Sequence, residues 1–391
     1  MSGRDDEADV LIVGAGPAGL AVGACLRQAG IERIAILEQS SEVGSAWRGH
    51  YDRLHLHTHK SISSLPGLRL PPDAPRYPSR LQLVAYLERY ATTFDLVPRF
   101  GQRAVSVAQA NGAWRVATED RAYVAKCLVV ATGRAARPLT PSWPGQEAYR
   151  GEVLHSSLYR NGSAYRNKPV LVVGFGNSGG EIAIDLHEHG AHAAIAVRGA
   201  VNVIPRDLLG VPIVSVAIAM ARLPGRLADL LAAPVLAGAV GDLTRYGLRK
   251  LPYGPITQIR EHRQVPLLDI GTVALIREGR LRIRPDLRGF TEDGVEFVDG
   301  TQEPFAAVVL ATGFQPNLDA LGGSLGEVLA DGYPVVSGRP TSLSGLYFCG
   351  FHVASTGMLR EIGIEARQIS RAIRRRNRAA LPTVTGAAAS R

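Results

Sequence analysis

The fold is decided by the stretch Val10-Leu11-Ile12-Val13-Gly14-Ala15-Gly16-Pro17-Ala18-Gly19, an apolar run followed by glycines at the spacing GxGxxG. Apolar residues after Gly19 recur at helical spacing, so the motif lies between a strand and a helix. Glycine suits this turn because the turn is tight and its backbone must approach a pyrophosphate at the helix N-terminus. The context predicts a dinucleotide-binding βαβ unit.

A second motif of the same kind follows the apolar run at residues 170–173. We expect Asn177 and Ser178, inside it, to cap the following helix and to contact a second pyrophosphate. The cofactor-binding residues predicted from the two motifs are Gly14, Gly16, Pro17, Ala18 and Gly19 in the first, and Gly174, Gly176, Asn177, Ser178 and Gly179 in the second.

The next strand of each unit ends in an opposite charge. The expected strand at residues 34–37 delivers Glu38, whose carboxylate can accept the hydroxyls of an unphosphorylated ribose. The expected strand at residues 193–197 delivers Arg198, whose guanidinium suits a 2′-phosphate. The first site is therefore predicted to hold FAD or NAD, and the second NADP(H).

A repeated Ala-Thr-Gly turn predicts how the chain is divided. Expected strands at residues 125–130 and 306–310 end at Ala131-Thr132-Gly133 and Ala311-Thr312-Gly313. We expect an α/β fold of two Rossmann-like domains, one inserted in the other. The FAD-binding domain is predicted at residues 1–164 and 312–391, and the NADPH-binding domain at 165–311.

A last strand and helix are expected to return to the first domain. The strand covers residues 345–349, Gly350 follows it, and the helix covers about 356–376. Backbone N–H groups at this turn and helix end are predicted to face an electron-accepting ring, where they would stabilise negative charge.

Composition excludes several classes of protein. The 391 residues are 46% hydrophobic and include three scattered cysteines, so neither a disulfide framework nor a redox-active cysteine pair is expected. The N-terminus is polar and acidic, unlike a signal peptide. These features favour a cytoplasmic enzyme with buried thiols.

Charge and hydropathy leave one alternative open. The net charge of +9 is ascribed to a solvated C-terminal helix and to arginines that serve anionic cofactors, and no nucleic-acid partner is expected. Residues 208–240 are the most apolar, but charges and prolines interrupt them before the length of a spanning helix. A helical insert at about 207–250 that covers a substrate cavity is favoured, and a weak membrane-surface contact is the alternative.

The two nucleotide sites predict that hydride passes from NADPH to a flavin. Because the chain lacks a cysteine pair, oxygen is the remaining obvious acceptor for the electrons of the reduced flavin. His55, His57 and His59 alternate, but no carboxylate completes a ligand set, so no metal site is predicted. We take His57 as the candidate catalytic residue, a proton carrier or hydrogen-bond donor near the flavin, and a histidine with a purely structural role is the alternative.

One stretch carries a family resemblance. Tyr149-Arg-Gly-Glu-Val-Leu-His-Ser-Ser-Leu-Tyr159 resembles the FxGxxxHxxx(Y/F) motif of the class B flavin-containing monooxygenases, with tyrosine for the leading phenylalanine. Further stretches resemble the YUCCA branch, the indole-3-pyruvate monooxygenases. They lie at residues 51–57, 77–80, 173–179, 266–271 and 311–314, and the resemblance covers about 9–376.

The resemblance implies a glutathione-reductase-like arrangement with FAD in the first domain and NADPH in the inserted one. It implies that reduced flavin adds oxygen at C4a and that retained NADP⁺ protects the hydroperoxide. His155 is expected to fix an interdomain turn, and Leu56 or His57 to replace an asparagine that many relatives carry at the flavin's reactive edge. Other residues implied to lie at the cofactors are Gly44, Trp47, Arg48, Thr132, Gly133, Thr312, Gly313 and Gly350.

The resemblance leaves the reaction open. One possibility is oxidative decarboxylation of a 2-oxo acid, with an arginine-rich cavity as the carboxylate anchor. N- or S-oxygenation of a small molecule is the alternative, and a flavin reductase or oxidase that passes NADPH electrons to a partner is a function of another class. A small-molecule substrate and O₂ are the expected partners of the first two, and the oligomeric state is left open.

Overall fold

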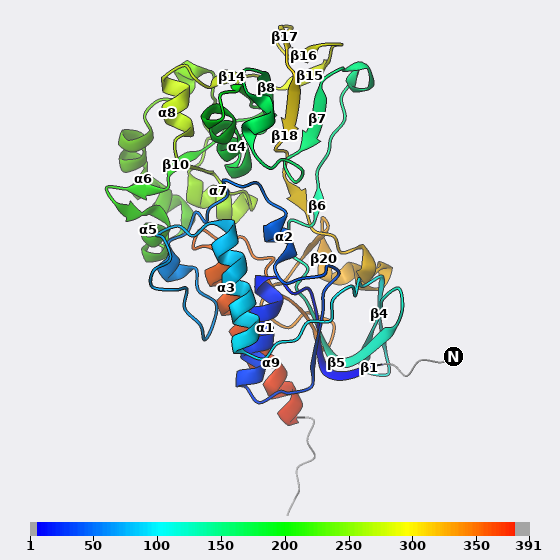
Figure 1. The fold of residues 1–391 in the computed structure, drawn as a ribbon. Helices are drawn as coiled ribbons and strands as arrows, with labels where there is room; N and C mark the ends of the chain where they lie inside the picture. The colour runs from blue at the N-terminus through cyan, green and yellow to red at the C-terminus, as the bar shows by residue number, and fades with distance from the viewer. Residues whose placement is uncertain (1–5, 380–391) are drawn as a thin grey trace, which may run out of the picture.

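The first of two lobes contains a mixed sheet (Figure 1). The computed structural model describes residues 6–379. The strand order is β2 (Ile34–Leu37), β1 (Asp6–Val13), β5 (Ala122–Val130), β4 (Ala113–Ala117) and β3 (Ser106–Ala110), and β22 (Leu346–Phe348) also pairs with β5. Strands β2, β1, β5 and β22 are parallel, whereas β3 and β4 form an antiparallel extension.

The second lobe contains a parallel sheet. Its order is β14 (Arg282–Arg284), β9 (His192–Ala196), β8 (Pro169–Val173), β18 (Ala307–Leu310) and β7 (Glu152–His155). The first strand pairs of each nucleotide unit, β1 with β2 and β8 with β9, are parallel and fully in register. Helices α1 (Pro17–Gln28) and α4 (Asn177–Glu188) connect these pairs. The predicted pair of Rossmann-like domains is confirmed.

Two short strands join the lobes. β6 (Arg137–Pro138) leaves the first lobe and pairs antiparallel with β19 (Phe314–Gln315), which returns to it. The boundary expected at residue 165 would separate β7 from its partner β18. We therefore propose that the inserted domain begins between β6 and β7.

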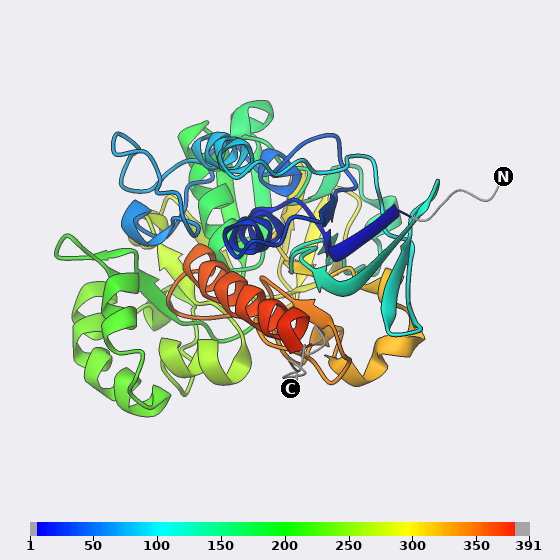
Figure 2. The same cartoon turned by 90° about the horizontal axis from the view of Figure 1, so that it is seen from below.

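The C-terminal helix completes the first lobe. α9 (Met358–Ala379) contacts α1 along its length, as the view from below shows (Figure 2). Ile362, Ala366, Ile369 and Ile373 are buried at the spacing of one helix face. This face covers α1, so the last part of the chain holds the first nucleotide-binding unit in place.

The excursion from the second lobe, residues 203–263, differs in part from the expected helical insert. It contains α5 (Ile213–Ala219), α6 (Gly225–Val240) and α7 (Pro255–His262), but it opens with β10 (Val203–Pro205) and a hairpin of β11 (Asp207–Leu208) and β12 (Val211–Pro212). The hairpin was not predicted. β10 pairs with β13 (Leu267–Asp269), which fixes the excursion to the second lobe.

The remaining elements lie around the two sheets. α3 (Arg80–Thr93) begins with a capping box between Ser79 and Gln82. The others are α2 (Ser45–Arg48), α8 (Thr272–Arg277), β15 (Leu287–Phe290), β16 (Gly294–Phe297), β17 (Gln302–Pro304), β20 (Leu329–Ala330) and β21 (Tyr333–Pro334).

Candidate active site

The glycines of the first turn have two different roles. Two of them are required by close packing of the backbone, and the third faces open space. A Cβ at Gly14 would lie 2.5 Å from the carbonyl oxygen of Ala131, and one at Gly19 would lie 1.8 Å from that of Gly14. A Cβ at Gly16 would meet no atom within 4 Å. Gly16 caps α1, which begins with Pro17 and buried Ala18. The open space at this helix N-terminus fits a pyrophosphate.

Glu38 lies beside the same turn. Its Oε2 accepts a hydrogen bond from the Ala15 N–H at 2.8 Å, and its Oε1 accepts one from the Ser40 N–H at 3.0 Å. These bonds hold a buried carboxylate at the end of β2, where it fits the ribose of an unphosphorylated dinucleotide. Thr132 Oγ1 is buried without a hydrogen-bond partner among the described residues, and Gly133 faces open space.

The second turn repeats this geometry. A Cβ at Gly174 would lie 2.5 Å from the Ala311 carbonyl oxygen, and one at Gly179 would lie 2.0 Å from that of Gly174. Again the middle glycine, Gly176, faces open space at a helix N-terminus. Arg198 follows β9 with an exposed side chain, so it is free to meet a 2′-phosphate.

The expected capping by Asn177 and Ser178 is wrong. Gly176 is the N-cap of α4, and no side chain caps it. Asn177 Oδ1 instead accepts a hydrogen bond from the Leu268 N–H at 2.8 Å. Asn177 therefore joins the glycine turn to β13 and lines the cavity described below.

Three residues implied to lie along the flavin are held by other contacts. Gly44 caps α2 with a φ of +69°, and Trp47 lines the cavity. Arg48 makes ion pairs with Glu42 and Glu88. These contacts fix the short helix between the first glycine turn and the cavity.

The expectation for the Gly350 turn is corrected for the Gly350 N–H, whereas for the N–H groups at the start of α9 it stays a prediction. The Gly350 N–H donates to Glu365 Oε2 at 2.6 Å, so it does not face a ligand. A Cβ at Gly350 would lie 3.0 Å from the Cβ of Ala18, and the φ of Gly350 is +89°. Glycine is therefore required by close packing of this turn against α1.

The turn at Thr312 and Gly313 belongs to the interdomain connection. Thr312 Oγ1 donates to the Leu139 carbonyl, and the Leu139 N–H donates to the Gly313 carbonyl at 3.0 Å. His155 Nε2 also donates to the Gly313 carbonyl at 3.0 Å, while its Nδ1 accepts from the Ser157 N–H. His155 thus fixes the interdomain turn, as expected.

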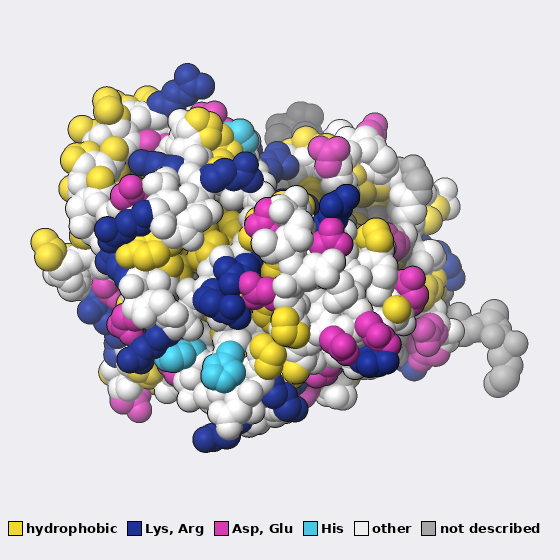
Figure 3. Space-filling model, turned by 90° about the horizontal axis from the view of Figure 1, so that it is seen from above, with side chains coloured by type: hydrophobic (Ala, Val, Ile, Leu, Met, Phe, Trp, Pro, Cys, Tyr) yellow, Lys and Arg dark blue, Asp and Glu magenta, His cyan; other side chains and the backbone are white. Residues whose placement is uncertain are grey.

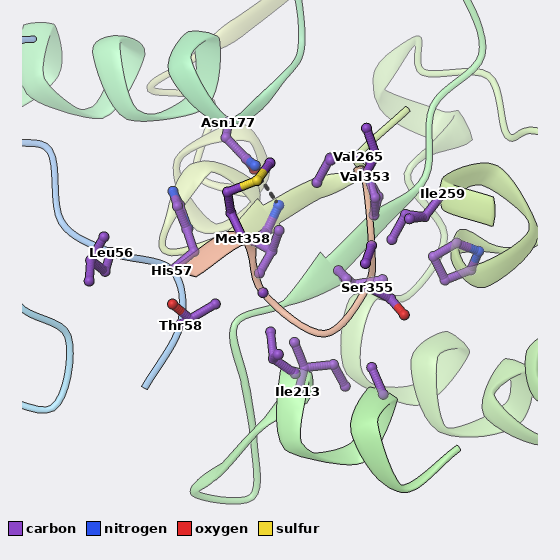
Figure 4. A pocket seen from close by; sticks show the side chains of 18 of the residues that line it. Leu56, His57, Thr58, Asn177, Ile213, Ile259, Val265, Val353, Ser355 and Met358 are labelled. Atoms are coloured by element: carbon purple, nitrogen blue, oxygen red, sulfur yellow. Dashed lines mark hydrogen bonds between the residues drawn. The ribbon is translucent and has the colours of Figure 1, made fainter. Parts of the chain in front are cut away.

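A cavity of about 350 Å³ lies between the lobes and the excursion. Figure 4 shows His57 and Asn177 at one side of it and Ile259 and Val265 at the other. Residues of α5 and α6 line this cavity. Its wall includes Ile213, Val214, Val216, Ala217, Met220, Ala232 and Leu236.

The expected arginine-rich cavity is wrong. Among the described residues that line this cavity there is no arginine, lysine, aspartate or glutamate. The polar lining comes from histidines, hydroxyl groups and the Asn177 amide. Arginines of the surrounding segments point elsewhere, for example Arg76, which pairs with Asp207.

His57 joins the two domains at the cavity wall. Its Nε2 donates to Glu181 Oε1 at 2.6 Å, and Glu181 is 2% exposed on α4. Glu181 Oε2 and His57 Nδ1 have no further hydrogen-bond partner among the described residues. The neighbouring Tyr51 is also buried, and burial together with Glu181 raises its pKa well above the usual value.

The two histidines next to His57 along the chain have separate partners. His55 Nδ1 lies 2.7 Å from the Arg53 carbonyl oxygen, and His59 Nδ1 accepts from the Ser61 N–H. Their Nδ1 atoms thus interact with nearby residues of the same segment, whereas the His57 ring hydrogen-bonds to a residue of the second domain.

Sequence reasoning missed Glu181, and it did not identify which residues of the apolar insert line the cavity. Glu181 follows the second glycine motif by two residues, and its place on the buried side of α4 was the available signal. The apolar wall residues have no such signal, because cavity-lining and core side chains of α5 and α6 share the same composition.

The comparisons agree with this geometry. A family model described as pyridine nucleotide-disulphide oxidoreductase matches residues 11–207. The indole-3-pyruvate monooxygenase YUCCA1 of Oryza sativa subsp. japonica is 41% identical over 316 residues, which is 79% of this chain and 77% of that protein. The probable indole-3-pyruvate monooxygenase YUCCA1 of Arabidopsis thaliana is 40% identical over 314 residues, covering 79% and 76%.

The chain belongs to the YUCCA branch of the class B flavin-containing monooxygenases. A solved flavin-containing monooxygenase of Stenotrophomonas maltophilia has the same fold, with a TM-score of 0.72 at 24% identity over 95% of this chain and 99% of that one. The protein is an FAD- and NADPH-dependent monooxygenase that acts on a small molecule and O₂.

Two further findings bear on this YUCCA-type enzyme. Cys25, Cys127 and Cys349 are free and buried. Within residues 6–379, no helix combines the length and the apolar character that crossing a bilayer requires.

Proposed function

We propose that this enzyme oxidatively decarboxylates a 2-oxo acid with an aromatic side chain, of which indole-3-pyruvate is the type. The observation that carries the proposal is the 41% identity to a relative named for that substrate. The apolar cavity of about 350 Å³ supports it, because an indole ring fits such a wall.

The overall reaction balances with one O₂ and one NADPH. The 2-oxo acid, O₂, NADPH and a proton give the shortened acid, CO₂, water and NADP⁺. The bond between the carbonyl and carboxyl carbons breaks, and one oxygen atom of O₂ enters the new carboxylate. NADPH supplies the two electrons that reduce the other oxygen atom to water.

We assign the cofactors to the two glycine turns. FAD, when bound, accepts hydride from NADPH and activates O₂. Gly16 and Glu38 are placed at its pyrophosphate and ribose, and buried Thr132 beside them. Gly176 and Arg198 are placed at the pyrophosphate and 2′-phosphate of NADPH. Helices α5 and α6 cover one side of the cavity and thereby limit the access of water to it.

We assign the polar wall of the cavity to the reacting end of the substrate. Glu181 holds the Nε2–H of His57 and thereby fixes the orientation of the ring, as a carboxylate often does for a functional histidine. Asn177 is held by Leu268 through its oxygen, which leaves the amide N–H₂ as a donor. We infer that these groups bind the substrate oxygens, while α5, α6 and α7 contact the ring.

N- or S-oxygenation is the second candidate. The absence of cationic side chains from the described cavity wall favours it, because a neutral amine or sulfide needs no carboxylate anchor. The test is NADPH consumption with indole-3-pyruvate, with an indole-containing sulfide and with an indole-containing tertiary amine, each followed by mass analysis of the product. Indole-3-acetate from the first substrate supports the proposal, and oxides of the other two alone would reject it.

We place the enzyme in the cytoplasm. The support is its cysteine chemistry, because three buried free thiols suit a reducing compartment.

A further inference from the structure

Helix α6 presents apolar side chains to solvent along one face. Leu227, Leu230, Leu231 and Val235 are exposed at the spacing of a single helix face, with Leu230 at 70%. The adjacent face, which turns inward, carries buried Ala228 and the cavity-lining Ala232 and Leu236. The outer leucines therefore contribute neither to the core nor to the cavity wall.

A hairpin at the start of the same excursion adds a protruding leucine. Leu209 is 99% exposed at the turn between β11 and β12. Its φ is +48°, in the left-handed region that asparagine or glycine adopts more readily than leucine. Neither packing within the chain nor turn preference explains a leucine here, so a contact outside the chain is the remaining explanation.

Basic side chains surround these apolar ones. The space-filling view shows yellow apolar side chains over this part of the molecule, with dark blue arginine and lysine between and around them (Figure 3). Over residues 203–263 the exposed acidic residues are Asp242 and Glu261. The exposed basic residues are Arg222, Arg226, Arg245, Arg249, Lys250, Arg260 and Arg263.

None of these seven basic side chains makes an ion pair with a residue of the described range 6–379, and two of them flank the start of α6. Arg222 ends the turn after α5, and Arg226 lies in the first turn of α6. A cation in the first turn of a helix is unfavourable, because the helix end is itself positive. An anion bound outside the chain would offset that cost.

Charge decides between two occupants of this surface. In a symmetric dimer the same patch meets itself, so the arginines of one copy would face those of the other. A bilayer with anionic lipids presents both an apolar layer for the leucines and negative headgroups for the arginines. The combination of charge and exposed leucines fits the bilayer.

We propose that the outer face of α6 and the Leu209 hairpin form a docking surface for an anionic phospholipid membrane. The protein lies on the bilayer, since α5 and α6 are too short to cross it. The inner faces of these helices roof the cavity, and Val265, which lines the cavity, is 43% exposed. The cavity thus reaches the surface beside α7, next to the docking surface.

Vesicle co-sedimentation of the FAD-loaded full chain tests the proposal. The probes are vesicles of phosphatidylcholine alone and vesicles with about 30% phosphatidylserine. We expect binding to the second kind that falls when salt is raised from about 0.1 M to about 0.5 M. Leu230→Ser/Leu231→Ser is expected to weaken binding about tenfold or more. Arg222→Ser/Arg226→Ser should weaken binding to the anionic vesicles and reduce its salt dependence.

Leu209→Asn separates docking from folding. Asparagine tolerates the left-handed turn, so this variant should keep or raise the melting temperature while it binds vesicles more weakly. Val97→Ser/Val298→Ser is the control, because both valines are exposed and lie outside the excursion. It should bind as the unaltered protein does.

Two results would overturn the proposal. One is an unaltered holoenzyme that stays in the supernatant with both kinds of vesicle. The other is a dimer in solution that Leu230→Ser/Leu231→Ser dissociates, since a second copy would then cover the face.

Discussion

At the residue scale, the two outer glycines and the middle glycine of each motif have separable roles. Gly176→Ala places a methyl group in open space and requires no strained backbone, whereas Gly179→Ala would place Cβ 2.0 Å from the Gly174 carbonyl oxygen. We expect Gly176→Ala to raise the KM for NADPH about tenfold with little change in melting temperature. Gly179→Ala should destabilise the protein by about 1–3 kcal/mol.

Kinetics with NADPH and thermal unfolding of the two variants check this prediction. The assignment is wrong if Gly176→Ala lowers the melting temperature as much as Gly179→Ala does and leaves the KM unchanged.

Arg198 is expected to distinguish the two nicotinamide cofactors. Arg198→Ala removes a cation from the 2′-phosphate, so the KM for NADPH should rise on the order of tenfold or more. The KM for NADH should change little. Arg245→Ala serves as the control, because Arg245 stacks over Tyr246 in the excursion. Equal effects of Arg198→Ala on both cofactors would contradict the assignment.

His155 makes stability depend on pH. Burial lowers the pKa of His155 below its ordinary 6.5, and the hydrogen bond to the Gly313 carbonyl opposes this only in part. The unfolded chain therefore takes up a proton that the folded chain refuses, and the free energy of unfolding falls as pH drops below about 6.5. His155→Gln keeps a donor for Gly313 but does not titrate.

Urea unfolding between about pH 7.5 and about pH 5.5 measures the effect. The loss of unfolding free energy on acidification should be smaller in His155→Gln than in the unaltered protein. An equal loss in both would show that His155 does not carry this dependence.

The cofactor-binding roles of residues in a glycine motif and at the end of the next strand could be predicted from sequence. In such a unit the strand, the turn, the helix and the next strand follow one another directly along the chain. Glu38 and Arg198 belong to that class. The Glu181 contact of His57 spans 124 positions, and the Gly350 contact with Glu365 depends on how α9 packs. Such contacts arise from tertiary packing, which no local pattern encodes.

At the element scale, the hairpin that opens the excursion is fastened to the first domain. Asp207 accepts from the Tyr77 hydroxyl at 2.6 Å and pairs with Arg76 at 2.9 Å. Burial and Asp207 raise the pKa of Tyr77 to about 12, so the hydroxyl remains a donor at neutral pH. These bonds hold the start of α5, and hence the cavity roof, against the segment that carries His57.

Asp207→Ala is expected to loosen this roof and admit water. Substrate-independent NADPH oxidation should rise about two- to fivefold, with its electrons recovered as hydrogen peroxide. Asp9→Asn is the control, since the ion pair of Asp9 with Lys126 lies in the first lobe. An unchanged ratio of peroxide to NADPH in Asp207→Ala would reject the role of this contact.

Periodicity predicted the long helices and buried strands well. It failed at the β11–β12 hairpin, because Asp207 to Pro212 show no alternation and a leucine fills a turn position that usually requires glycine or asparagine. Periodicity also failed at β7, because the sequence of this strand does not indicate which of the two sheets the strand belongs to.

At the scale of the whole molecule, the chain contains two similar nucleotide-binding units, one predicted to hold NADPH and the other FAD. Electrons are expected to pass from the NADPH unit to the FAD unit. Equivalent glycine turns lie at the ends of β1 and β8, and the interdomain strands β6 and β19 join the two units. The cavity between them is where NADPH, flavin and substrate would meet. The protein therefore has no need of the cysteine pair that disulfide reductases use.

In each turnover the enzyme is expected to consume one NADPH and to transfer one atom of O₂ to the product. Incubation with ¹⁸O₂, NADPH and indole-3-pyruvate tests it directly. We predict indole-3-acetate with one ¹⁸O atom in its carboxylate and about one NADPH consumed per product. Unlabelled product, or NADPH electrons recovered entirely as hydrogen peroxide or on another acceptor, would contradict it.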